Sequence, residues 1–485
     1  MAESAEISDG FLINNLYKIL YNEYGEGGFK DIFEKIGISS EIERGDIGDE
    51  QVKRIQEWID KQDEMQNKQI KLIVLLEQFR KVSDNEKEFD RQLEIAEKIY
   101  EPLIEVIVKR MTDSDIMGRV ISDYKVILKF FKDTQKYAFR TKEFKRDNIT
   151  HQIRVFLLGC YILYEDPDFW VKRIQEDFNK IIRIREINYS YSFKDILEAW
   201  AIASLFHDIG RPIEDAKEAL KFYKNTYNFE KIRRFREISF TCDVKDDEKH
   251  RFKEIPLLIK LDNLAVEVIV NLIGLAKDAS TTKSIEKKVR NLDHGAVGAI
   301  LCINLDSKVA LRALSHRPSL IPMALESLVA IALHDNCKFF FCSALTQLLI
   351  FSDELQEWNR VTIIGDREVM IFPCRKIFIK IGEKDDEKLI RAVIPYERPK
   401  DMTAQEIFKR FEPMKKWEEN RKNFEEATKM GTFQRNFRRG VGLEVHIITN
   451  PESLSDVITI AIDGNNGSVA YRKTNIGDII LKDRR

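Results

Sequence analysis

The chain contains one apolar helical run that ends abruptly in polar residues, AWAIASLFHDIGRP at positions 199–212. Its apolar residues recur at the three- and four-residue spacing of a buried helix. His207 and Asp208 close the run, and Gly210 and Pro212 predict that the regular helix stops there. An imidazole beside a carboxylate supplies half of a coordination shell suited to zinc, manganese or iron. The dipeptide alone is common, so its meaning depends on the rest of the chain.

Further apolar runs predict a mainly helical core around this segment. The four strongest lie at 155–164, 196–206, 294–303 and 324–333. Residues 213–290 interrupt them with a charged insertion, which is typical of a solvated loop or helix face. Residues 1–112 predict helices with heavily charged faces, packed on the core or on a partner.

The periodicity of the sequence changes after Arg360. Short β-rich runs broken by glycine, proline and charged turns predict strands, with a long polar helix at about 404–430. The runs are VTIIG, EVMIFP, RKIFIKIG, LIRAVIPY, LEVHIIT and VITIAID. We therefore expect a mainly α protein in three parts: a helical N-terminal region at 1–112, a helical core domain at 113–360, and a small α+β domain at 361–485.

The bulk composition limits the classes of function. The 485 residues are 44% hydrophobic and 33% charged, with a net charge of -2. This balance argues against a dedicated nucleic-acid surface, but it is compatible with a local basic pocket for a phosphorylated small molecule. The six cysteines form no CxxC pair, which favours buried, reduced thiols. We see no signal peptide and no apolar run that could span a bilayer, and expect a soluble cytoplasmic protein.

Two other polar residues stand at apolar helix boundaries. His151 opens a helix in NITHQIRVFLLG, with Asn148 or Thr150 as the candidate N-cap. Asp353 emerges from the apolar helix LTQLLIFSDELQEW. A buried aspartate is costly without a partner, so a metal ion or a basic group is expected beside it.

The order H…HD…D, formed by His151, His207-Asp208 and Asp353, resembles the HD superfamily of metal-dependent phosphohydrolases. The local motifs THQIRV, LFHDIGRP and IFSDELQEW are similar to the histidine helix, the central element and the final aspartate helix of that family. The resemblance covers residues 145–360, about half of the chain. It implies an all-helical HD-type core and a phosphohydrolase or phosphodiesterase that acts on a nucleotide or related phosphoester through a metal-activated water.

His294 and His334 extend the resemblance to the family members that hold two metals. It implies a first divalent ion on His151, His207, Asp208 and Asp353. The second would bind His294 and His334, with Asp208 bridging; manganese, iron, cobalt, zinc and magnesium are the candidate metals. A single metal, with His294 and His334 as substrate contacts, stays open. The second dyad, His334-Asp335, leaves open which side chain faces the metal, and no GYP motif follows.

The resemblance also implies roles for nearby charged residues. Asp208 and Arg211 are the expected catalytic residues, because Arg211 follows the HD dyad where a cation could hold the phosphate. Glu354 and Glu357 could support the metal ligands as hydrogen-bond partners, but an exposed helix face is the favoured expectation. Weaker candidates for phosphate contact are Lys145, Arg146 and Arg360.

The sequence leaves open three alternatives to a metal-dependent phosphohydrolase. The same ligand set occurs in di-iron oxygenases built on the HD fold. A non-catalytic HD module would bind a nucleotide or a partner, and the N-terminal helices suit a protein partner or a homo-oligomer. Finally, the histidines could be ordinary core residues, although that does not explain their order at helix boundaries.

Overall fold

The computed structural model describes the chain in segments. These are residues 5–45, 47–61, 67–83, 88–108, 145–146, 149–182, 190–211, 214, 293–304, 320–334, 343–356, 362–364, 367–369, 377–384, 387–395, 441–448, 457–462 and 469–474. The described part is mainly helical, as the sequence predicts, with strands concentrated after residue 361. No helix in this part is both long and apolar enough to cross a membrane.

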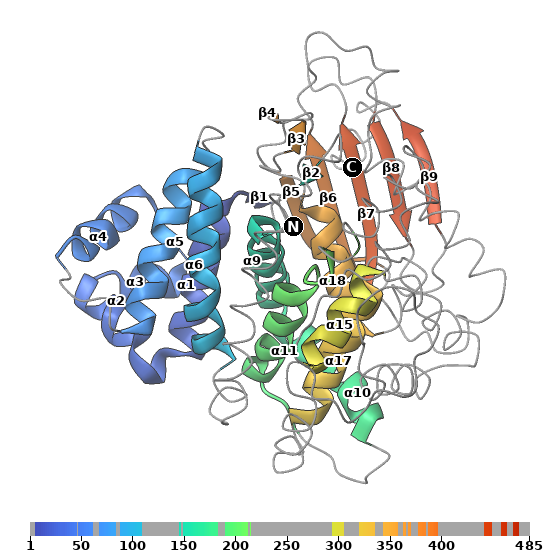
Figure 1. Cartoon of the computed structure of the whole chain (residues 1–485), viewed down its shortest axis with the longest axis horizontal. Helices are drawn as coiled ribbons and strands as arrows, with labels where there is room; N and C mark the ends of the chain where they lie inside the picture. Colours follow the sequence, from blue (N-terminus) through green and yellow to red (C-terminus); the bar gives the residue numbers. More distant parts are fainter. Residues whose placement is uncertain are drawn as a thin grey trace, which may run out of the picture.

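The N-terminal region is helical, as predicted, and it packs on the core. Figure 1 shows it as a separate layer of helices beside the central ones, and α1 and α6 contact the core helix α9. Its elements are α1 (Asp9–Glu23), the π-helix η1 (Gly25–Phe29), α2 (Lys30–Ile36), α3 (Ser39–Arg44), α4 (Asp49–Ile59), α5 (Lys68–Ser83) and α6 (Phe89–Ile107).

The core contains six described helices, and four of them, α9, α11, α15 and α17, coincide with the predicted apolar runs. The six are α9 (Ile149–Glu165), α10 (Pro167–Ile182), α11 (Phe193–Phe206), α15 (His294–Asn304), α17 (Leu320–Leu333) and α18 (Ala344–Leu355). Helix α11 packs against α9 and α17, and both α15 and α18 pack against α17. Helices α9, α15 and α18 are therefore assembled around the pair α11 and α17.

Close packing fixes α9 against α11. A Cβ built on Gly159 would lie 1.9 Å from Cζ2 of Trp200, so only glycine leaves room for this indole. Trp200 Nε1 also donates to the carbonyl of Phe156 at 3.0 Å, which satisfies the buried N–H. The start of α11 is fixed by a capping box between Ser192 and Asp195.

The strands form two sheets. The larger has the order β1-β5-β6-β7-β8-β9, antiparallel except between β6 and β7. The smaller has the order β2-β3-β4. The strands are β1 (Ala5–Ile7), β2 (Lys145–Arg146), β3 (Thr362–Ile364), β4 (Arg367–Val369), β5 (Ile377–Lys384), β6 (Glu387–Pro395), β7 (Val441–Ile448), β8 (Val457–Ile462) and β9 (Val469–Thr474).

All six predicted β-rich runs overlap a strand, whereas β1, β2 and β9 were not predicted. Strands β1 and β2 have three and two residues, too few to show an alternating pattern. The helix expected at 404–430 and nearly all of the 213–290 insertion lie outside the described residues. The domain boundaries at 112 and 360 also fall outside the described residues and stay predictions.

The N-terminal segment connects the large sheet to helix α9. Strand β1 pairs with β5 at the edge of the sheet, with Ala5 opposite Ile379. Asp9 then begins α1 and forms a buried salt bridge to Arg154, whose Nη2 lies 2.9 Å from Oδ2. Arg154 is one helical turn beyond His151 on α9, so this ion pair holds the helix that carries the first candidate ligand.

Candidate metal centre

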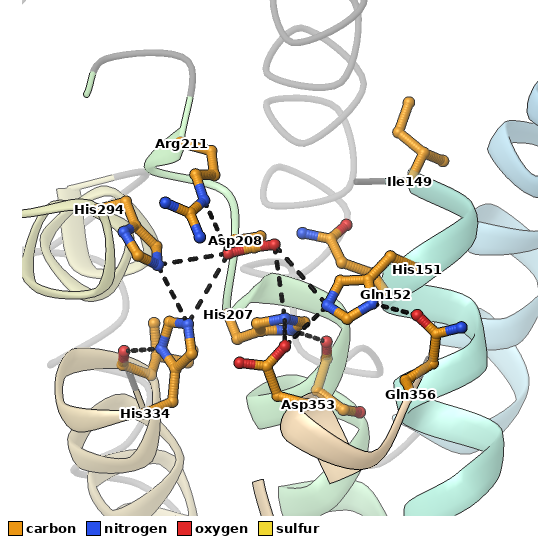
Figure 2. A network of polar contacts seen from close by, with 12 residues as sticks. Ile149, His151, Gln152, His207, Asp208, Arg211, His294, His334, Asp353 and Gln356 are labelled. Atoms are coloured by element: carbon orange, nitrogen blue, oxygen red, sulfur yellow. Dashed lines mark hydrogen bonds and ion pairs between the residues drawn. The ribbon is translucent and has the colours of Figure 1, made fainter. Parts of the chain in front are cut away.

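Five separate segments bring the six predicted ligands into one buried cluster. Figure 2 shows Asp208 at its middle, with two histidines on one side and two histidines and an aspartate on the other. None of the six residues is more than 8% exposed. They are His151 on α9, His207 and Asp208 after α11, His294 at the start of α15, His334 after α17 and Asp353 on α18.

His207 and His334 occupy equivalent positions. Each is the first residue after its helix, and each ring points its Nδ1 at a carbonyl oxygen of the last turn. The distances are 2.6 Å from His207 to Ser204 and 2.7 Å from His334 to Ile331. The end of the helix thereby orients both rings. The imidazole of His334 faces the cluster, whereas Asp335 lies outside the described residues.

One oxygen of Asp208 faces the first group of ligands. Its Oδ2 is 3.6 Å from Nε2 of His207 and 4.0 Å from Nε2 of His151. Asp353 completes this group, with Oδ1 at 2.8 Å from His151 Nε2 and 3.8 Å from His207 Nε2. The ligand atoms of His151, His207 and Asp353 all lie within 4.8 Å of one another.

The other oxygen of Asp208 faces the second group. Its Oδ1 is 3.4 Å from Nε2 of His294 and 3.7 Å from Nε2 of His334. The two Nε2 atoms are 3.3 Å apart. His207, Asp208 and His334 also form a compact set, so His207 lies near both groups. The two carboxylate oxygens of Asp208 thus point at different sets of nitrogen atoms, which is the arrangement of a bridging ligand.

Every one of the four histidines has an oxygen acceptor at Nδ1. Such an acceptor keeps the ring proton on Nδ1 and leaves the Nε2 lone pair directed at the centre, as in most metal-bound histidines. The acceptors are Gln356 Oε1 for His151, Ser204 O for His207, Glu214 Oε2 for His294 and Ile331 O for His334.

This arrangement leaves nitrogen lone pairs that a cation would satisfy. With both protons on Nδ1, the Nε2 atoms of His294 and His334 face each other at 3.3 Å, which calls for a proton or a cation between them. His207 Nε2 is buried and makes no hydrogen bond within the described part of the chain. A divalent cation bound by nitrogen and oxygen ligands satisfies all of these atoms.

The electrostatics of the cluster keep His207 neutral and Asp208 ionised, which are the protonation states that bind a metal. Burial lowers the pKa of His207 to about 4, so the ring is neutral near pH 7. Burial alone would raise the pKa of Asp208, but His207 and Arg211 outweigh it and hold the pKa well below the ordinary range. A neutral imidazole beside an ionised carboxylate is the state that coordinates a metal.

Arg211 and Glu214 form the more exposed side of the cluster. Arg211 Nε lies 3.6 Å from Asp208 Oδ1, and its Nη1 lies 3.1 Å from Glu214 Oε2. Their side chains are 35% and 28% exposed, compared with 3% for the neighbouring His294. Solvent therefore reaches the cluster near Arg211, the residue expected to contact phosphate.

The sequence reasoning missed Gln356 and Glu214. The spacing of each residue in the sequence could have indicated its role. Gln356 follows Asp353 by three residues and Glu214 follows Arg211 by three, and this spacing places each pair on one helical face. The pairing of Glu214 with His294 crosses 80 residues and has no local signal.

The expectation that Glu354 lies on an exposed helix face is wrong. Glu354 is 6% exposed because α18 is buried on all sides, packed against α9, α10, α11 and α17. Glu357 and Arg360 lie outside the described residues. Lys145 and Arg146 form β2, and their side chains are not described. The candidate N-cap Thr150 lies inside α9, which begins at Ile149.

No known family model, curated protein or solved structure matches the chain.

Proposed function

We propose that the cluster binds two divalent cations and that the chain is a metal-dependent phosphohydrolase or phosphodiesterase of the HD superfamily. The substrate would be a nucleotide or a related phosphoester. One observation carries the proposal: the two oxygens of Asp208 face two separate sets of histidines whose Nδ1 atoms are all engaged. Ordinary core histidines would need no such common orientation toward a buried carboxylate.

The donor set fits two cations. His151, His207, Asp208 and Asp353 would hold the first, and His294, His334 and Asp208 would hold the second. Imidazole nitrogen with carboxylate oxygen favours manganese, iron, cobalt or zinc, whereas magnesium prefers oxygen ligands and bound water. Bound cations of this kind activate water near neutral pH and neutralise the charge of phosphoryl oxygens.

The protein groups around the cations bind and orient the phosphate. Arg211 lies on the exposed side, beside Asp208, where its guanidinium can donate two parallel hydrogen bonds to phosphate oxygens. The ligands themselves are almost fully buried, which limits bulk water and strengthens electrostatic contacts. Gln356 and Ser204 hold the rings of His151 and His207 in place.

Elemental analysis of the purified protein, prepared without chelator, tests the proposal. We expect about two equivalents of divalent metal in the wild type and loss of metal in Asp208→Ala, because this variant removes a ligand from both sites. Asp31→Ala, an exposed substitution on α2, is the control and should keep both equivalents. Hydrolysis of bis(p-nitrophenyl) phosphate and of nucleotides should follow the metal content.

Several results would contradict the proposal. A wild type without metal after reconstitution would indicate a non-catalytic binding module. Full metal content and turnover in Asp208→Ala would refute the assignment of the site. Iron that cycles between oxidation states, in a protein that cleaves no phosphoester, would indicate an oxygenase.

A further inference from the structure

Four charged or polar groups form a closed ring on the exposed side of the cluster. Glu214 Oε2 accepts from Nδ1 of His294 at 2.8 Å and from Nη1 of Arg211 at 3.1 Å. Arg211 Nε and His294 Nε2 both face Oδ1 of Asp208, at 3.6 Å and 3.4 Å. One carboxylate oxygen of Glu214 therefore fixes two side chains, Arg211 and His294. Figure 2 shows both of these side chains directed at Asp208.

The acceptor of His294 differs from those of the other three rings. His151, His207 and His334 point Nδ1 at uncharged oxygens of an amide side chain or the backbone. Among the described contacts of the four rings, only His294 directs its Nδ1 at a carboxylate. A carboxylate holds the ring orientation and raises the basicity of the imidazole, and both effects strengthen a metal–nitrogen bond.

We infer that Glu214 is a positioning residue that controls occupancy of the second cation site and the placement of Arg211. This inference rests on the proposed binuclear centre. Glu214 keeps the proton of His294 on Nδ1, so that Nε2 faces Asp208 and His334. The same oxygen holds Arg211 beside Asp208, which links the phosphate-binding cation to the second metal site.

If Glu214 has this role, a substitution at position 214 should affect the two cation sites differently. Loss of a carboxylate that supports a metal-bound histidine typically weakens metal affinity by about 10–100-fold. In Glu214→Ala this loss should fall on the second site, because Glu214 accepts from Nδ1 of His294, a ligand of that site. Glu214→Gln keeps an acceptor oxygen without the charge, and should lose less affinity than Glu214→Ala.

Titration of the metal-free protein with manganese(II) chloride separates the two sites. Calorimetry gives the affinity of each site, and electron paramagnetic resonance separates a single Mn²⁺ ion from a spin-coupled pair. We expect the coupled signal in the wild type and a single-ion signal in Glu214→Ala at the concentration that fills both wild-type sites. The control is Glu176→Gln, which breaks a matched Arg–Glu pair three residues apart on α10, Arg173 to Glu176 at 3.6 Å.

Each outcome decides one of the two proposals. Coupled binding with wild-type affinity in both Glu214 variants would overturn the positioning role and leave the binuclear centre standing. A wild type that binds one ion or none would overturn the binuclear centre, and the role of Glu214 with it. Should Glu214→Ala fail to fold, Glu214→Gln still decides the question, because an unchanged second affinity would refute the inference.

Discussion

Replacing Gly210 with alanine should separate His294 from the rest of the metal centre. Gly210 lies in the turn after His207 and Asp208, where the chain crosses the start of α15. A Cβ built on Gly210 would lie 2.1 Å from the carbonyl oxygen of His294 and 2.8 Å from the backbone nitrogen of Gly298. Both atoms belong to backbone, so no side chain can rotate away to relieve the contact.

The size of the effect follows from these distances. An ordinary carbon–oxygen contact needs about 3.3 Å, so the 2.1 Å contact requires the two backbones to separate by roughly 1 Å. Overpacking of this kind typically costs about 1–3 kcal/mol of stability. Ligand positions in a metal site tolerate only about 0.5 Å of displacement. The second cation should therefore be lost even in a variant that folds.

Thermal unfolding of the metal-free protein and a manganese titration would test this prediction together. We expect Gly210→Ala to unfold a few degrees below the wild type and to bind only the first cation. Gly382→Ala on β5 is the matched control, because a Cβ there meets nothing within 4 Å. If Gly210→Ala binds the second cation as tightly as Gly382→Ala does, the close approach of the turn to α15 does not position His294.

Three further substitutions or reactions test other parts of the structure. Arg211→Ala should keep both metals but lower kcat/KM about 10–100-fold, since a hydrogen bond to a charged group contributes about 1.5–3 kcal/mol; loss of metal would contradict its role at the phosphate. Asp9→Asn leaves Arg154 buried without its anion, and urea unfolding should show a loss of about 3–5 kcal/mol. Burial raises the pKa of the Cys160 thiol well above its ordinary value. Iodoacetamide at pH 8 should therefore modify Cys160 only after unfolding, as peptide mass spectrometry would show.

The sequence predicted the local structure well where a periodic pattern was long. The apolar runs became α9, α11, α15 and α17, because residues spaced by three and four must share one buried face of a helix. The β-rich runs became strands for the corresponding reason at a period of two. Strand β1 was missed because three residues carry no period and its pairing with β5 is decided far along the chain.

The sequence alone also identified six candidate ligands: four through their order and their positions at helix boundaries, and His294 and His334 through the resemblance to family members that hold two metals. It could not supply the geometry that makes them one site. His151 and Asp353 approach within 2.8 Å across 202 residues, and His294 and Glu214 within 2.8 Å across 80. The role of Gly210 likewise appears only when α15 lies against it, since the sequence indicates only that the helix stops near this residue. Periodicity determines which face of a helix is buried, whereas the packing of several helices decides which buried residues meet.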